Sequence, residues 1–167
     1  MKNISFRDDV LPLKDELFRL ALHITLSRED AEDIVQDTLM KVWKRRDSWE
    51  SIESIKAYSL TICRNLSLDH LKLHENQNLH LDNLAEQTEH SSNPYDQILI
   101  KDRVRIVKML IESLPEKQRT CIQLRDIEGK AYKEIAEIMQ VSEEQVKVNI
   151  FRARQAIKQK MKKVEDK

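Results

Sequence analysis

A single glycine, Gly129, and three prolines are the only strong helix breakers in this chain of 167 residues. A fold rich in β-sheet needs many turns, and turns draw heavily on these two residue types. Charged residues make up 35% of the chain and occur in long segments of mixed sign, as is typical of exposed helix faces. The sequence therefore predicts an all-α protein.

Composition divides the chain into three stretches. Residues 1–75 and 99–167 show apolar residues at helical spacing, and each stretch is long enough for a small helical domain. Residues 76–98 between them are polar and contain no Lys or Arg, and the Ser-Ser-Asn-Pro run at 91–94 is typical of a break between elements. Two small helical domains joined by a flexible acidic linker are expected.

The segment 142–162 predicts an amphipathic helix with an unusual outer face. Ser142 and Gln145 match the capping box that begins many helices. At about 100° per residue, one narrow apolar stripe contains Val146, Ile150, Ala153, Ile157 and Met161. Phe151 points about 140° away from Val146 and therefore faces outward. Its neighbours on that face are Lys147, Val148, Arg152 and Gln155.

The residues before this helix predict a helix-turn-helix. The sequence AYKEIAEIM at 131–139 has helical spacing, and only Gln140 and Val141 separate it from the next helix. Further upstream, Pro115 opens another helix and Gly129 ends it. In a helix-turn-helix the second helix enters the major groove of DNA. The seven basic and zero acidic residues of 147–163 suit that role.

A second helix is predicted to begin after Ser27, with the sequence DAEDIVQDTLMKVWKRR from Asp30 onward. Its apolar stripe contains Ala31, Ile34, Val35, Thr38, Val42 and Trp43. Its first half is acidic and its second half basic, which complements the helix macrodipole. Asp33, Gln36 and Asp37 therefore belong either to a solvated face or to a surface that binds a protein, and the pattern alone favours the solvated face.

Two aromatic residues near the middle of the first stretch are candidates for contact with an unpaired base. Trp49 lies in the predicted loop 48–54, and Tyr58 shares one polar side of the following helix with Asn65. An aromatic ring and an amide can stack on a base and hydrogen-bond to it. From spacing alone, packing of Tyr58 against a neighbouring helix is the commoner explanation.

Metal, redox and membrane chemistry receive little support from the sequence. Cys63 and Cys121 lie far apart in apolar helical surroundings, so two buried reduced thiols are expected. No run of about 18 apolar residues exists, so membrane insertion is not expected and the cytoplasm is the expected location.

One histidine pair could bind zinc. His70 and His74 are four residues apart, with Asp69 beside them and His80 nearby. The pair lacks the glutamate of a zinc-protease motif, and no third ligand has a recognised spacing. A single glycine also rules out a glycine-rich phosphate loop. No metal, no cofactor and no enzymatic activity are therefore predicted.

Together these motifs resemble the bacterial RNA polymerase sigma factors of the sigma-70 family, in particular its extracytoplasmic-function (ECF) group. The resemblance covers roughly residues 17–161. It rests on AEDIVQDTLMKVW, on AYSLTICRNLSLDHLK and on the helix-turn-helix, which occur in the family's order. The linker resembles that of the family only in its acidic, polar character. The resemblance implies a helical bundle like sigma region 2, followed by a helix-turn-helix like sigma region 4.

The resemblance also implies roles for particular residues. Asp33, Gln36 and Asp37 are expected to bind core RNA polymerase, with Trp43 in the core behind them. Residues that open the −10 element and capture a flipped base are expected to be Trp49, Tyr58 and Asn65, although the family usually has Trp in place of Tyr58. The expected −35 contacts are Ser142, Gln145, Lys147, Val148, Phe151 and Arg152, with Arg154 on phosphate.

The chain departs from the family pattern at two places. Many members have Ser-Arg where this chain has Val148-Asn149, which bears on base specificity, and Gly where it has Gln140. A turn made without glycine costs about 1 kcal/mol if the backbone φ is positive there. The implied partners are core RNA polymerase, double-stranded and melted promoter DNA, and an anti-sigma factor.

Two other interpretations stay open at this stage. A transcription regulator that binds duplex DNA alone would share the helix-turn-helix, and a purely structural helical protein would share the fold. The 29 basic and 29 acidic residues give zero net charge, which is unusual for a protein that binds DNA alone. A gel shift with and without core polymerase separates these classes.

Overall fold

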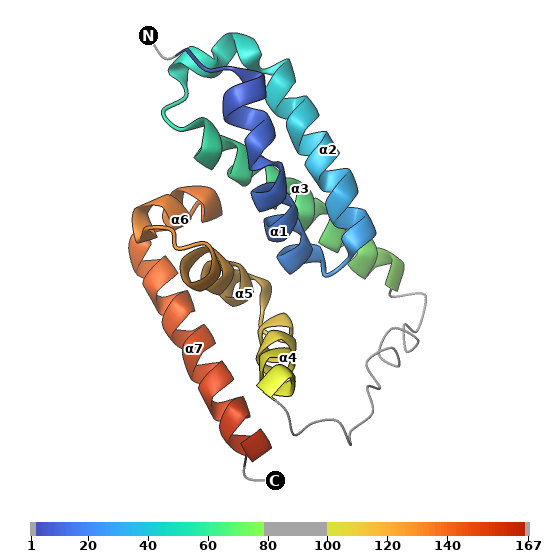
Figure 1. Ribbon diagram of the computed structural model, residues 1–167, viewed down its shortest axis with the longest axis vertical. Helices are drawn as coiled ribbons and strands as arrows, with labels where there is room; N and C mark the ends of the chain where they lie inside the picture. Colours follow the sequence, from blue (N-terminus) through green and yellow to red (C-terminus); the bar gives the residue numbers. More distant parts are fainter. Residues whose placement is uncertain (1–2, 79–99, 166–167) are drawn as a thin grey trace.

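The computed structural model describes residues 3–78 and 100–165, and every regular element in these two ranges is helical (Figure 1). The N-terminal half contains α1 (Lys14–Thr25), α2 (Arg28–Lys44) and α3 (Ile55–Asn78), with short helical turns η1 (Phe6–Val10), η2 (Leu11–Leu13) and η3 (Arg46–Ser51). The C-terminal half contains α4 (Ile100–Glu112), α5 (Glu116–Ile122), η6 (Gln123–Ile127), α6 (Tyr132–Met139) and α7 (Glu143–Glu165). The all-α prediction is confirmed. Of the predicted linker, residues 76–78 continue α3, and residues 79–98 lie outside the described residues.

Side-chain caps fix where two of the long helices begin. The Ser27 hydroxyl accepts a hydrogen bond from the Asp30 backbone N–H at 3.2 Å, ahead of α2. Before α7, the Ser142 hydroxyl accepts from the Gln145 N–H at 3.1 Å, and the Gln145 side-chain oxygen accepts from the Ser142 N–H at 3.3 Å. This reciprocal pair is the predicted capping box, and it satisfies two N–H groups that have no partner inside the helix.

The turn of the helix-turn-helix is built without glycine. Gln140 has φ 58° and follows α6 in the left-handed conformation, so the cost considered for a positive φ at this position applies. Leu26 ends α1 in the same conformation. Each such residue costs about 1–2 kcal/mol relative to a right-handed one. At Gln140 the packing of the next residue, Val141, against the main core helps to hold the turn.

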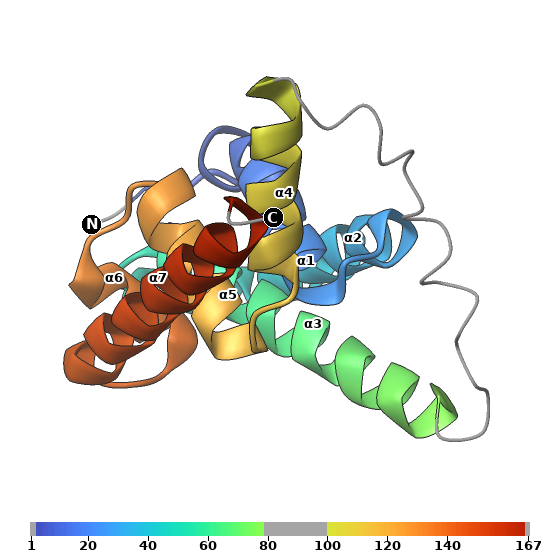
Figure 2. The same cartoon turned by 90° about the horizontal axis from the view of Figure 1, so that it is seen from below.

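The two halves pack on each other and share one hydrophobic core. Figures 1 and 2 show α3 lying against α6, and α1 against α5. The main cluster of buried side chains draws on both halves: Leu17, Leu20, Ile24, Ile34 and Leu60 from the N-terminal half, and Leu124, Ile135, Ile138 and Ile150 from the C-terminal half. The sequence predicted two domains but left their relative placement open. The structure places them in direct contact.

One buried guanidinium links the ends of two helices across this boundary. Arg119 of α5 is 7% exposed and donates to the backbone oxygens of His23 and Ile24, the latter at 2.9 Å. These carbonyls lie in the last turn of α1, where no intrahelical donor is available. Arg119 also donates to the carbonyl of Glu112 at the end of α4 and to that of Leu114.

Ion pairs surround the same boundary. Lys130 is 5% exposed and pairs with Glu16 of α1 at 2.6 Å and with Glu134 at 3.2 Å. Burial alone would lower the pKa of Lys130, but its two carboxylate partners outweigh burial and raise it. Arg19 of α1 forms two hydrogen bonds with Glu128, at 2.6 and 2.9 Å, and the pKa of Glu128 is lowered by them.

Candidate nucleic-acid and protein interfaces

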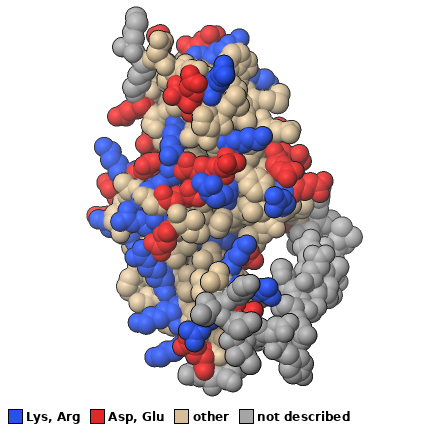
Figure 3. Space-filling view, in the orientation of Figure 1, with Lys and Arg blue, Asp and Glu red and all other residues tan. Residues whose placement is uncertain are grey.

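The outer face of α7 matches the face predicted to contact DNA. Val146 and Ala153 on its inner side are fully buried and Ile150 is 2% exposed, whereas Phe151 on the opposite side is 64% exposed. The outward position of Phe151 is therefore confirmed. Lys and Arg side chains follow α7 along the left of Figure 3. An exposed aromatic ring on a basic helix indicates a surface that contacts a partner.

A hollow of about 530 Å³ lies beside the first half of α7. Four predicted −35 residues line it together with Lys117 of α5: Ser142, Gln145, Val148 and Arg152. The ammonium of Lys147 lies 5.5 Å from the centre of the Tyr132 ring. Hydroxyl, amide, apolar and cationic groups thus lie together on one face, as needed to contact both base edges and phosphates.

Arg154 is held by a protein carboxylate. Its guanidinium forms two hydrogen bonds with Asp126, at 2.6 and 3.2 Å, and this pairing is the main reason for the raised pKa of Arg154. The side chain of Arg154 is half exposed. To contact a DNA phosphate, Arg154 would therefore have to exchange the Asp126 carboxylate for the phosphate. The sequence did not indicate this step.

The acidic face of α2 is exposed and continuous. Asp33, Gln36 and Asp37 all point to solvent, on the side away from the buried Ile34 and Val35. Spacings of three and four residues place them within one turn of each other. The structure thus brings the three predicted polymerase-binding residues together on one surface.

The expectation that Trp43 lies in the core is wrong. Its side chain is 46% exposed, with the Arg46 guanidinium 4.4 Å above its ring and Phe6 edge-on at 5.2 Å. Side chains from the short turns η1 and η3 contact the ring, including Trp49 edge-on at 6.3 Å, and part of it stays exposed. Together with Leu39 and Met40, Trp43 and Phe6 line an apolar hollow of about 360 Å³.

The structure also corrects the prediction for Trp49. Its ring is 8% exposed, and its indole N–H donates to the Val42 carbonyl at 3.0 Å. Because η3 folds back on the end of α2, the ring fills a small core with Val10 and Val42. Trp49 therefore presents no face on which a base could stack in this arrangement.

Tyr58 and Asn65 remain candidates for base contact. Tyr58 is half-buried and packs against the small core that contains Trp49, whereas Asn65 is exposed. Seven residues of helix separate them by about 10 Å along α3. Packing of Tyr58 against its neighbours, the commoner explanation from spacing, is confirmed, and base contact by its partly exposed ring stays a prediction.

The remaining reactive groups lie elsewhere. Cys63 and Cys121 are buried free thiols, as predicted, and burial raises their pKa values to about 12 and about 11. Among the described residues, Asp30, His70 and His74 form the group whose side chains could hold a metal ion. In the same part of the chain, no helix combines the length and apolar character that crossing a membrane requires.

Comparison with known proteins identifies two family segments. Residues 10–76 match the family described as sigma-70 region 2, and residues 105–157 match sigma-70 region 4. The chain is 31% identical over 145 residues to the ECF RNA polymerase sigma-E factor of Haemophilus influenzae, covering 81% of this chain and 77% of that protein. It is 32% identical over 141 residues to the sigma-E factor of Escherichia coli K12, covering 79% and 74%.

Solved structures show the same arrangement of helices. The sigma factor RpoE from Bartonella quintana, solved in complex with the anti-sigma factor NepR, has a TM-score of 0.73 at 26% identity and covers 94% of this chain and 96% of that chain. CnrH, solved with the cytosolic domain of CnrY, has a TM-score of 0.66 at 20% identity, covering 94% and 87%. The second likeness concerns the fold alone.

Proposed function

Because the chain belongs to the ECF sigma factors of the sigma-70 family, the non-catalytic subunits that direct RNA polymerase to promoters, we propose how its surfaces divide that work. The acidic face of α2 binds core polymerase, the polar side of α3 contacts the melted −10 element, and α7 reads the −35 element. The exposed Phe151 among cations carries the last assignment. Since polymerase and promoter are cytoplasmic in bacteria, we place its action in the cytoplasm.

The α2 face is assigned to polymerase because Asp33, Gln36 and Asp37 point to solvent together and their side chains form no hydrogen bond or ion pair with the described residues. Carboxylates so arranged suit a basic protein surface and repel DNA phosphates. The apolar hollow around Trp43 lies about two turns further along α2. Its exposed apolar surface would be stabilised by burial under a protein partner.

We expect Asp37→Arg to weaken binding to core polymerase at least about tenfold, since like charges now meet across the contact. Asp47→Arg in η3 makes the same charge change away from the α2 face and serves as the matched control. Titration of core polymerase with fluorescently labelled protein measures both. If the two variants bind core polymerase with equal affinity, the α2 face is not the polymerase-binding surface.

The −10 assignment rests on the exposed amide of Asn65 and the partly exposed ring of Tyr58 on α3. Melting a base pair needs no bond chemistry. It needs stacking and amide contacts that favour the extruded base over the paired one. Trp49 is left out of this set because it is buried.

The packed arrangement of the two halves must open before both promoter elements are bound. The −10 and −35 elements are named by their positions along the promoter, so they lie about 25 base pairs apart. That is about 85 Å of duplex at about 3.4 Å per pair. In the structure, α3 contacts α6 and α6 contacts α7, and helices in contact have axes about 8–10 Å apart. The packed form therefore holds the two DNA-binding surfaces much closer together than their targets. We propose that it is the free, inactive form.

An anti-sigma factor is the partner we propose for the packed form. An apolar groove of about 440 Å³ runs along the boundary, lined by α1, α4 and η6. Leu26, Val104 and Ile127 in its walls are each about half exposed or more. Because both halves line this groove, an apolar helix bound in it would hold them together. The Bartonella relative, solved with its anti-sigma factor, supports this class of partner.

The pair of Arg19 and Glu128 allows a test of the packed form by charge exchange. Glu128→Arg or Arg19→Glu places like charges across the boundary, so we expect each to raise the radius of gyration measured by small-angle scattering. The double exchange restores opposite charges and is expected to return the radius toward that of the wild type. Because Arg19 is nearly half exposed, each shift is modest and shrinks with added salt.

The same three variants test the anti-sigma proposal. Binding of such a factor should weaken in both single variants and recover in the double exchange. If the radius is the same in all three variants, the packed form is not the free state. If the radius changes and anti-sigma binding does not, the groove is not its site.

A further inference from the structure

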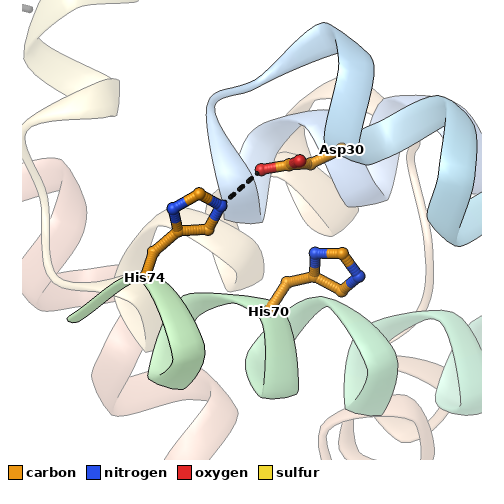
Figure 4. A group of neighbouring side chains, drawn as sticks. All are labelled: Asp30, His70 and His74. Atoms are coloured by element: carbon orange, nitrogen blue, oxygen red, sulfur yellow. Dashed lines mark hydrogen bonds and ion pairs between the residues drawn. The ribbon is translucent and has the colours of Figure 1, made fainter. Parts of the chain in front are cut away.

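Three side chains with metal-binding atoms meet where α2 begins and α3 nears its end. His70 and His74 lie one turn apart on α3, and Asp30 lies in the first turn of α2 (Figure 4). One ligand atom from each residue lies within 4.8 Å of those of the other two. His74 Nε2 is 2.9 Å from an Asp30 carboxylate oxygen. Figure 4 shows both imidazoles on the side of α3 that faces Asp30.

We propose that Asp30, His70 and His74 form a binding site for a divalent cation of the zinc class. Two imidazoles and one carboxylate are a donor set that zinc uses, with a fourth position left to water. Imidazole ligands favour zinc and its transition-metal neighbours over magnesium or calcium, which prefer oxygen ligands. The sequence showed the histidine pair but gave no third ligand, because Asp30 lies 40 residues earlier in the chain.

The distances fit a site that needs only a small adjustment. With metal–ligand bonds of about 2.0–2.2 Å, tetrahedral ligand atoms lie about 3.3 Å apart. The two histidines are on consecutive turns of one helix face, so both rings reach the same point above α3. His74 is exposed and the other two residues are partly exposed, which leaves space for a water ligand and for rotation of the rings.

The proposed metal would clamp two helices of the N-terminal half. Asp30 belongs to α2 and lies three residues before Asp33, the first residue of the acidic face. The histidines belong to the C-terminal half of α3, which ends at Asn78. A bound cation would fasten this end of α3 to the start of α2. This inference does not depend on the proposed polymerase and promoter contacts.

Titration calorimetry with Zn²⁺, on the full chain after treatment with a chelator, tests the site directly. We expect one ion per chain, and at least about tenfold weaker binding for each of His70→Ala, His74→Ala and Asp30→Asn. The matched control is the double variant His80→Ala/His90→Ala, which removes the two histidines outside the described residues. It should bind zinc as the wild type does. Co²⁺ in place of Zn²⁺ should give the visible absorption of tetrahedral coordination.

Folding of the variants is checked separately by thermal melting without metal. Asp30→Asn keeps the α2 cap, because Ser27 accepts from the backbone N–H of Asp30. Saturating Zn²⁺ should raise the melting temperature of the wild type by several degrees and leave that of His74→Ala unchanged. The proposal is overturned if zinc does not bind, if binding is lost only in the His80/His90 variant, or if His70→Ala and His74→Ala bind as the wild type does. In each case the His74–Asp30 contact is an ordinary hydrogen bond.

Discussion

Replacing Arg119 with Met is expected to lower the free energy of unfolding by about 3–5 kcal/mol. The guanidinium donates to four backbone carbonyls, two in the last turn of α1 and two at the end of α4 and just after it. Met fills a similar volume but donates nothing, so these carbonyls lose their partners in a mostly buried place. A positive charge also suits the negative end of each helix dipole, and that contribution is lost as well.

Urea denaturation followed by circular dichroism measures this effect. Arg119→Lys should give an intermediate loss, because an ammonium cannot reach four carbonyls with the fork geometry of a guanidinium. Arg105→Met removes an exposed cation from α4 and should change the free energy of unfolding by no more than about 0.5 kcal/mol. If Arg119→Met behaves like Arg105→Met, the two halves are not packed together in solution.

Phe151→Ala is expected to reduce transcription from a cognate promoter about 10- to 100-fold and to leave stability unchanged. The first part follows if the ring makes an apolar base contact, since single contacts in the major groove are worth about 1–3 kcal/mol. The second part follows from exposure, because a side chain 64% exposed contributes little to folding. Arg152→Ala should behave in the same way, since Arg152 lines the same face.

Val164→Ala supplies the matched control for Phe151. It removes an exposed apolar side chain from the far end of the same helix, and it should leave promoter use unchanged. Run-off transcription with core polymerase measures activity, and thermal melting measures stability. A marked fall in melting temperature in Phe151→Ala would show that the residue belongs to a packed core. Unchanged transcription would show that the α7 face is not the −35 contact.

The sequence predicted most of what local rules govern. The small number of glycine and proline residues predicted the all-α class, and the Ser142–Gln145 capping box predicted the start of α7. Helical periodicity placed Phe151 correctly because the inner stripe of α7 is long and regular, so its opposite face is unambiguous. The absence of glycine from the turn at Gln140 is visible in the sequence, but only the structure shows that its φ is positive.

Predictions failed where burial depends on distant parts of the chain. Trp43 continues the apolar stripe of α2, but Phe6, Arg46 and Trp49 from short helical turns contact only part of its ring, which stays half exposed. The sequence predicts Trp49 in a loop, whereas η3 folds it into a small core in which its indole N–H donates to the Val42 carbonyl. Arg119 carried no sequence signal, since its four carbonyl partners come from segments that only folding brings together. The same holds for Asp30 beside His70 and His74.

Transcription in vitro with core polymerase on a library of genomic fragments, with the start sites sequenced, tests the central claim most directly. We predict new start sites that are absent with core polymerase alone, each preceded by a shared −10 and a shared −35 sequence at constant spacing. We also predict that the −35 sequence, but not the −10, loses its influence on start-site choice in Phe151→Ala. The protein does not act as a promoter-specificity subunit if it adds no start sites, or if it binds duplex promoter DNA tightly without polymerase.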